Sequence, residues 1–386
     1  MPLRIPYTVW LVVVGLIIGL LPHPQAIELT PRLVLFVFLP PLLFAGGWSI
    51  DTDELAKNWA LVTLLATLGV VLGIAISYVL LVFGAHMGSE TALIFGAVVA
   101  ATDPVAVLAL FRAMRINATV QTVVEGESLF NDGTAAVTFT VLLATLAQSR
   151  ASLDVPAALW YFALLTAGGV AVGVVVGYAV RLLFRVVARR LPLVAILTAI
   201  AAYGAYFIAD YLGVSGIMAV VFAAIVAAGS RSLSRLSDQD RAWVGSFWAV
   251  VAFVANTGVF VLIGVSIHMA DIAAIWPAAL LGIAAVMLGR PLIVHLFAPV
   301  SALLGRPLKP SWKNAIALAG MRGALSMALA LSLPVGFPDR ALLVSMVFAV
   351  VLFTIVVQGA LLEPLLRGMG LIGERPAQAA GLEGRP

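Results

Sequence analysis

The chain of 386 residues contains no cysteine, and only 10% of its residues are charged. The lack of cysteine excludes disulfides, c-type haem attachment and thiolate zinc sites, and it leaves the cellular compartment open. Soluble domains carry charge on roughly 25% of their residues. A chain with 63% hydrophobic residues and so little charge has too few polar groups for a water-facing surface. The composition therefore predicts an all-α polytopic membrane protein.

Long apolar runs take the place of the missing charge. Because the hydrocarbon core of a bilayer is about 30 Å thick, a helix needs roughly 20 apolar residues to cross it. Turn residues and charges divide the sequence into about twelve such runs, which predict twelve transmembrane helices. The runs cover residues 6–21, 31–48, 59–83, 91–111, 120–147, 156–180, 191–211, 214–228, 243–267, 272–304, 312–333 and 340–366.

The 22 basic residues are distributed unevenly between the two sides of these runs. If successive runs alternate in direction, Arg32, Arg150 and Arg340 fall on one side of the membrane. Arg290 and Arg322 lie within runs, and all other Lys and Arg residues fall on the opposite side. Since positive loops stay in the cytoplasm, this bias predicts a multi-pass protein of the cell (inner) membrane with both termini cytoplasmic. It also explains the net charge of +4 without a nucleic-acid partner.

Two of the runs contain residues that interrupt a helix. Pro104 follows Asp103 in the fourth run, where proline removes a helical hydrogen bond and disfavours helix at the residue before it. Gly320, Arg322 and Gly323 interrupt the eleventh run. Broken helices at membrane depth are tolerated where they line a cavity or are buried in protein, and a pair of them in two halves of a chain indicates a transporter site.

The spacing of the two breaks predicts two inverted repeats. The broken runs are the fourth and the eleventh, and an odd offset places them in opposite orientations, as inverted repeats require. The first repeat then has one helix fewer than the second. We predict a single transmembrane domain at residues 1–368 and a short polar cytoplasmic tail at 369–386. Within that domain lie a first repeat at about 5–147, a linker helix at about 156–180 and a second repeat at about 191–366.

Four polar residues form two stripes on the fifth predicted helix. Ser128 and Asp132 are i,i+4 neighbours, and Glu127 and Asn131 form a second such pair, displaced by one residue around the helix. Charges within the membrane are expensive and mark ion pathways. A carboxylate binds Na⁺ or a proton but scarcely both, so Asp132 is the first candidate for an ion carrier. The alternative is a buried structural carboxylate paired with a base.

The other polar residues of the membrane region have two interpretations each. At the first break, Asp103, Thr102 and the freed carbonyls offer oxygen ligands to a cation, whereas Asp before Pro is also a good helix cap or turn residue. Glu127 requires a cationic partner, and the membrane supplies Arg290 and Arg322. We assign Glu127 a structural role, because buried ion pairs are strongly destabilised when one partner is removed. Arg322, at the second break, is predicted to be a fixed charge near the site.

Six short motifs occur in order along most of the chain. They are Arg-Ile-Pro-Tyr at 4–7, Phe-Leu-Pro-Pro-Leu-Leu-Phe at 38–44, Thr-Asp-Pro-Val at 102–105, Gly-Glu-Ser-Leu-Phe-Asn-Asp at 126–132, Gly-Arg at 289–290 and Arg-Gly-Ala at 322–324. Together they resemble the sodium/proton exchangers of the first cation/proton antiporter family, which includes the NhaP-like and animal exchangers.

The resemblance implies roles for the residues around the first break. Asp132 corresponds to the aspartate that binds cation and proton in turn, and Asn131 is its characteristic neighbour. Thr102, Asp103 and Ser128 are implied to be further members of the Na⁺ site. An Asn-Asp pair in place of two consecutive aspartates resembles the electroneutral branch, which exchanges one cation for one proton.

The resemblance also bears on the framework. It implies that Glu127 and Arg290 form a structural ion pair and that Arg322 lies at the second of two crossed discontinuous helices. Ala45 stands where many relatives have Glu, which leaves the choice between Na⁺ and K⁺ open. Relatives also have a further helix before the first run, so we expect that helix to be missing in this chain, in a naturally shorter protein or through a late start site. Relatives are homodimers, and a homodimer is expected.

These observations predict a secondary antiporter that exchanges Na⁺ or Li⁺ for H⁺ by alternating access, with no cofactor and no enzymatic activity. K⁺/H⁺ exchange is the alternative within the same mechanism. In a different class, Asp103 and Asp132 would form the dyad of an intramembrane aspartyl hydrolase, but the Gly-x-Gly-Asp motif of such enzymes is absent. A passive channel is the third possibility, and counter-transport in vesicles separates it from an exchanger.

Overall fold

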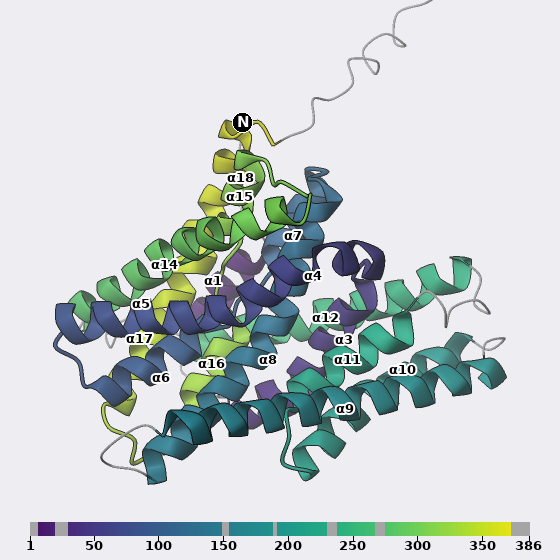
Figure 1. The fold of residues 1–386 in the computed structure, drawn as a ribbon, viewed down its shortest axis with the longest axis horizontal. Coiled ribbons are helices and arrows are strands. Elements are labelled where there is room, and N and C mark those ends of the chain that lie inside the picture. Colours follow the sequence, from purple (N-terminus) through teal and green to yellow (C-terminus); the bar gives the residue numbers. More distant parts are fainter. Residues whose placement is uncertain are drawn as a thin grey trace, which may run out of the picture.

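The computed structural model describes residues 7–19, 30–148, 154–187, 191–229, 238–266 and 275–371, and within these ranges the chain is helical apart from short turns and loops (Figure 1). Two segments, η1 and η3, are single π-helical stretches inside longer helices. The helices are α1 Tyr7–Gly19, α2 Pro31–Leu33, η1 Val34–Phe38, α3 Leu39–Ser49, α4 Thr52–Ala66, α5 Leu68–Gly84, α6 Ser89–Ala100, α7 Val105–Ala113, α8 Ala118–Gln148, α9 Val155–Val187, α10 Leu191–Tyr211, α11 Gly216–Ala228, α12 Asp238–Ser266, α14 Trp276–Leu303, α15 Pro310–Leu318, α16 Ala324–Leu331, α17 Arg340–Phe353, η3 Thr354–Gln358 and α18 Gly359–Gly368.

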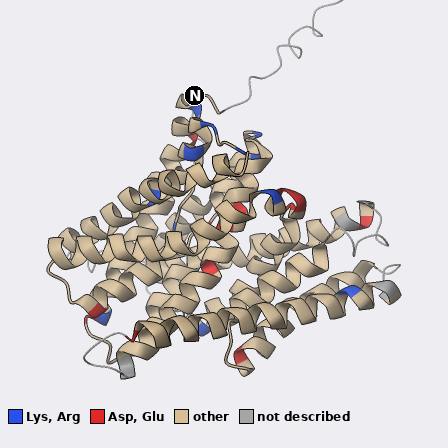
Figure 2. Ribbon diagram, in the orientation of Figure 1, with Lys and Arg blue, Asp and Glu red and all other residues tan. Residues whose placement is uncertain are grey.

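The described helices have the length and composition of membrane spans. Nine helical stretches among the described residues are long and apolar enough to cross a membrane, and Tyr7–Gly19 and Gly216–Ala228 are shorter apolar helices. Charged residues are few and lie mostly near helix ends (Figure 2). Large apolar side chains face outward, among them Trp160 at 72% and Val175 at 68% exposure on α9. Surfaces of this kind are stable against lipid but not against water.

Each predicted apolar run overlaps a helix or a pair of half-helices, although residues 6, 20–21, 267 and 272–274 of these runs lie outside the described residues. How many helices cross the membrane stays a prediction. Several boundaries were wrong: α9 ends at Val187 and not at residue 180, α12 begins at Asp238 and not at residue 243, and α4 begins at Thr52 and not at residue 59. Asp51 caps α4, because one carboxylate oxygen accepts the backbone N–H groups of Asp53 and Glu54. The polar first turns therefore extend the helix beyond its apolar run.

The helices pack in two groups. One group contains α1, α3 and α9–α12, in which α11 packs against α3, α9 and α10, and α1 packs against α12. The other contains α4–α8 and α14–α18, in which α8 packs against α4 and α6. In Figure 1, α5, α6, α14 and α17 lie toward the left and α10, α11 and α12 toward the right. The division into two inverted repeats is not tested by this packing and stays a prediction.

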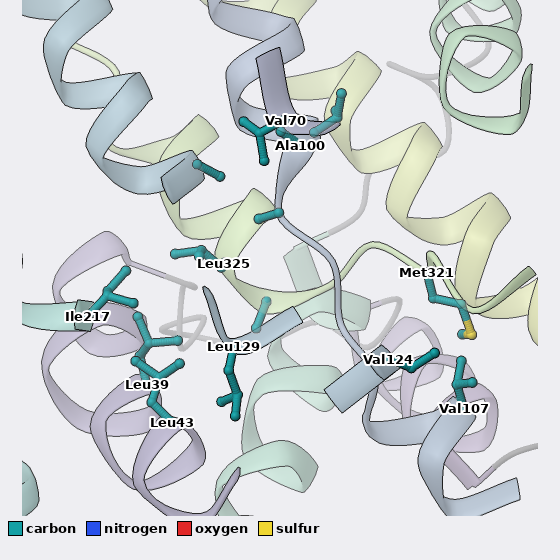
Figure 3. Packing of buried hydrophobic residues seen from close by; sticks show 14 of the residues in the cluster. Leu39, Leu43, Val70, Ala100, Val107, Val124, Leu129, Ile217, Met321 and Leu325 are labelled. Carbon is teal, nitrogen blue, oxygen red and sulfur yellow. The ribbon is translucent and has the colours of Figure 1, made fainter. Parts of the chain in front are cut away.

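One large cluster of buried apolar side chains extends through both groups. Figure 3 shows part of it, with Leu39 and Leu43 from α3, Leu129 from α8 and Leu325 from α16. The chain between α6 and α7 runs without helical structure through this region, next to Ala100. A polar, unwound segment therefore lies deep inside an apolar protein, where its backbone groups need partners.

Candidate functional site

The two broken helices meet at their breaks. Residues 101–104 separate α6 from α7, and residues 319–323 separate α15 from α16. The backbone N–H of Asp103 donates to the carbonyl oxygen of Met321 over 2.7 Å. Gly323 lies so close to Asp103 that a Cβ atom at this position would collide with the aspartate side chain. The crossing therefore requires glycine, and each break satisfies backbone groups of the other.

Arg322 occupies the same crossing. Its guanidinium Nη1 donates to the carbonyl oxygens of Ala100 and Ala101, at 2.5 and 3.1 Å. These carbonyls belong to the end of α6, which carries the partial negative charge of a helix C-terminus. The side chain is 8% exposed. Arg322 thus places a fixed positive charge at the end of the first broken helix, and it does not pair with Glu127.

Asp103 both caps a helix and lines a cavity. One carboxylate oxygen, Oδ1, accepts the backbone N–H of Val105 over 3.0 Å, which caps the first turn of α7. The residue also lines a cavity of about 430 Å³. The sequence left a choice between a cap and an ion ligand, and the geometry permits Asp103 to serve as both.

Three side chains connect the first break to α8. The hydroxyl of Ser128 donates to the carbonyl oxygen of Thr102. The amide nitrogen of Asn131 donates to Thr102 Oγ1 and to Glu127 Oε1, both at 3.2 Å. Thr102, Ser128 and Asn131 are all buried. The unwound segment is therefore held against the two polar stripes of α8.

One carboxylate oxygen of Asp132 has no partner among the described residues. Within the part of the chain that the structure describes, Oδ1 is buried and accepts no hydrogen bond, and no cationic side chain lies within ion-pair distance. The alternative of a structural carboxylate paired with a base is thus not supported. A buried, unsatisfied carboxylate oxygen is costly unless a proton or cation binds to it.

Glu127 and Arg290 form a bidentate ion pair. Arg290 Nη1 and Nη2 lie 2.7 Å from Glu127 Oε1 and Oε2, and the side chains of Arg290 and Glu127 are 7% and 1% exposed, respectively. Arg290 Nη2 also donates to the carbonyl oxygen of Ile316 over 3.4 Å. The pair therefore connects α8 with α14 and α15. Sequence alone left Arg290 and Arg322 as possible partners of Glu127, and the structure selects Arg290.

The two α8 stripes face different cavities. Asp132 and Ser128 line a cavity of about 430 Å³, together with Thr102 and Asp103. Its opposite wall comes from α3 and α12, and Ala45 is part of it. The stripe of Glu127 and Asn131 faces a space of only about 30 Å³, which Arg290 and Arg322 also line. Of the eight predicted site residues, four thus line the larger cavity and the other four line the smaller space. The first four are Thr102, Asp103, Ser128 and Asp132, and the others are Glu127, Asn131, Arg290 and Arg322.

The donor set of the larger cavity suits a monovalent cation. It offers two carboxylates, from Asp103 and Asp132, and hydroxyl and backbone oxygens, from Thr102 and Ser128. Hard cations prefer oxygen ligands of this kind. Because Asp132 Oδ1 is not engaged by the described residues, it is free to take a cation or a proton.

A polar pair in the last helix was not predicted from the sequence. Thr354 and Gln358 bound the π-helical segment η3. The backbone N–H of Arg322 donates to Thr354 Oγ1 over 3.1 Å, and Gln358 Nε2 donates to the carbonyl oxygen of Leu318 over 2.8 Å. The two side chains therefore satisfy both ends of the second break. Single π-helical turns are common at functional sites.

Thr354→Val is expected to destabilise the protein by about 1–3 kcal/mol, because it removes the acceptor of the buried Arg322 N–H without changing the side-chain shape. Thermal unfolding in detergent should show a lower midpoint than for Thr140→Val, in which the lost hydroxyl is exposed and bonds only to its own helix. Equal midpoints for the two variants would show that η3 does not support the break.

A second unpredicted contact lies at the edge of the larger cavity. Glu125 is buried, and its Oε1 accepts a hydrogen bond from Ser49 Oγ over 2.6 Å. Arg112 Nη2 lies 3.5 Å from the same oxygen. All three residues line the cavity. This contact could not be predicted from the sequence, because it depends on how α3, which carries Ser49, and α7, which carries Arg112, pack against α8.

Comparisons with known proteins agree with this arrangement. The profile of a family described as "Sodium/hydrogen exchanger, transmembrane" matches residues 1–368. The low-affinity Na⁺/H⁺ antiporter NhaS1 of Synechocystis sp. is 36% identical over 382 residues, covering 97% of this chain and 71% of the relative. The Na⁺/H⁺ antiporter ApNhaP of Aphanothece halophytica is 37% identical over 375 residues, covering 96% of this chain and 71% of the relative.

A solved structure shows the same fold. The sodium proton antiporter MjNhaP1 from Methanocaldococcus jannaschii superposes with a TM-score of 0.70 at 23% identity, covering 92% of this chain and 93% of that chain. The predicted all-α polytopic membrane fold is confirmed. The related proteins are named as transporters and not as enzymes, which confirms the predicted class and argues against the intramembrane hydrolase.

Proposed function

Because the chain belongs to the sodium/hydrogen exchanger family, we propose that it exchanges Na⁺ or Li⁺ for H⁺ across a membrane. The observation that carries this proposal is the buried Oδ1 of Asp132, which has no partner among the described residues and belongs to a cavity rich in oxygen ligands. A group that binds either a proton or a cation, but not both at once, couples the two movements in opposite directions.

In the proposed cycle, Asp132 alternates between a protonated and a cation-bound form. Thr102, Asp103 and Ser128 contribute oxygen ligands when the cation is bound. In both forms the charge of the carboxylate is neutralised. Moving a neutral site through the membrane interior costs less free energy than moving a charged one. Empty, ionised Asp132 is the least stable state, so the site changes its exposure only when it is occupied.

Alternating access requires parts of the site to move together. We propose that the crossed half-helices α6, α7, α15 and α16 move with α8, because hydrogen bonds tie both breaks to one another and to this helix. The Glu127–Arg290 ion pair holds α8 to α14 through the movement. α3 and α12, which form the other wall of the cavity, supply the surface against which this unit moves.

We propose one-for-one exchange, and the neighbour of Asp132 supports it. The amide of Asn131 takes up no proton near neutral pH, and its nitrogen is already bonded to Thr102 and Glu127. Electroneutral exchange is therefore expected. A current through a supported membrane at symmetric pH that grows with Na⁺ concentration would contradict it.

Cation choice is the point at which K⁺/H⁺ exchange competes with Na⁺/H⁺ exchange. Ala45 lines the cavity with a methyl group, so the α3 wall contributes no carboxylate at this position. We propose Na⁺ or Li⁺ as the substrate because the relatives are named for sodium. A pH-sensitive dye inside proteoliposomes tests this directly: addition of Na⁺ or Li⁺ should dequench it, and a response to K⁺ alone would identify a potassium exchanger.

We further propose the cell membrane as the location, cytoplasmic termini and a homodimer as the assembly. The first two rest on the charge bias of the loops. Part of that bias comes from arginines outside the described residues, such as Arg189, Arg231 and Arg375. Cross-linking in native membranes tests the dimer, and the accessibility of single cysteines, introduced into this cysteine-free chain, tests the orientation.

A further inference from the structure

Glu125 lies on the same face of α8 as Asp132. The two residues are seven positions apart, which is two helical turns or about 10 Å along the axis. Both line the larger cavity. A cation that enters along this face therefore passes Glu125 on its way to Asp132 if it comes from the N-terminal end of α8.

The surroundings of Glu125 indicate that this end of the cavity is its mouth. The Arg112 side chain is 57% exposed, whereas that of Glu125 is 10% exposed. Glu125 is thus set into the wall, and Arg112 reaches it from the solvent side. Ser49, at the end of α3, fixes the carboxylate with a hydrogen bond of 2.6 Å.

The ion pair between Glu125 and Arg112 is weak enough for a cation to displace Arg112. Its closest atoms are 3.5 Å apart, and one partner is mostly in solvent. Such pairs contribute little free energy and are screened by salt. The Glu127–Arg290 pair on the same helix is the contrast, because it is bidentate, 2.7 Å long and buried on both sides. A hydrated cation competes with Arg112 but not with Arg290.

We propose that Glu125, Ser49 and Arg112 form an outer site for a monovalent cation, in which the cation replaces the guanidinium of Arg112 before it reaches Asp132. The proposal rests on the exchange function proposed above. The outer site raises the local cation concentration at the cavity mouth, as charged clefts do for their ligands. Arg112 keeps Glu125 neutralised while no cation is present.

The competing explanation is a structural tie, in which the contacts of Glu125 only hold α3, α7 and α8 together. Two variants distinguish such a tie from an outer site. Glu125→Gln keeps an acceptor for Ser49 and removes the charge. Arg112→Gln removes the competitor of the cation. A tie would be weakened in the same way by both variants. An outer site predicts that Glu125→Gln weakens cation uptake and that Arg112→Gln does not.

The test is Na⁺ titration of dye-loaded proteoliposomes at constant ionic strength. Glu125→Gln should raise the KM for Na⁺ roughly threefold to tenfold with an unchanged maximal rate, as expected for the loss of one screened charge about 10 Å from the ion site. Arg112→Gln should leave this KM unchanged or lower it. Asp53→Asn, an exposed carboxylate outside the cavity lining, is the matched control and should behave as wild type.

An unchanged KM in Glu125→Gln, or a raised KM in both variants, would overturn the outer site. The wild-type protein is measured in the same series. Wild-type vesicles that show no response to any alkali cation would overturn the exchange function itself, so the two failures are distinguishable.

Discussion

Asp132→Asn is expected to reduce Na⁺-driven proton movement in proteoliposomes to the level of protein-free vesicles. The substitution keeps nearly the same shape but removes the charge that binds Na⁺ and the site that binds the proton. It also replaces a carboxylate whose buried Oδ1 has no described partner by a neutral amide. The loss of stability should therefore be small compared with the loss of exchange. The measurement is the dequenching of an internal pH dye after an outward or inward Na⁺ gradient is imposed.

A control must show that replacing an aspartate elsewhere in the protein does not abolish exchange. Asp210→Asn serves this purpose, because Asp210 is exposed near the end of α10 and does not line the larger cavity. It should exchange at the wild-type rate. An Asp132→Asn protein that elutes and unfolds like wild type yet exchanges normally would remove Asp132 from the proposed mechanism.

Glu127→Gln is expected to lower the stability of the protein more than Thr354→Val does. It leaves the buried guanidinium of Arg290 without its carboxylate partner, and breaking a buried ion pair costs about 3–5 kcal/mol. The expected result is a large fall in the thermal midpoint in detergent, or failure to accumulate in the membrane. Arg290→Met should have a comparable effect, because it leaves the buried carboxylate of Glu127 without its cationic partner.

The double variant Glu127→Gln with Arg290→Met distinguishes a structural pair from a transport residue. Removing both charges at once leaves no buried ion unpaired, so the double variant should be more stable than either single variant. We expect it to retain measurable Na⁺/H⁺ exchange, because neither residue lines the larger cavity. A double variant that is stable but inactive would assign Glu127 a direct part in transport.

The class of protein and the position of the breaks could be predicted from the sequence because each has a local cause. Low charge and long apolar runs leave few folds other than a helical membrane protein. Pro104 breaks a helix wherever it lies, and the i,i+4 spacing of Ser128 and Asp132 fixes their shared face. These inferences need no knowledge of which helices are neighbours.

The pairing of side chains across helices could not be predicted in the same way. Glu127 had two possible partners in the sequence, and the choice of Arg290 depends on where α14 packs. The role of Thr354 also depends on packing, since one threonine in an apolar run gives no signal until Arg322 lies beside it. The start of the third helix was missed for a different reason: a capped polar turn resembles a loop when only apolar residues are counted.

The most direct test of the account is proton release from the purified protein when Na⁺ binds. The protein is held in weakly buffered detergent solution, and Na⁺ replaces choline at constant ionic strength. Competition at Asp132 predicts an acidification that saturates with Na⁺ in the wild type and in Asp210→Asn, and none in Asp132→Asn. An equal acidification from Asp132→Asn would contradict the central claim, because the proton displaced by the cation would then come from another group.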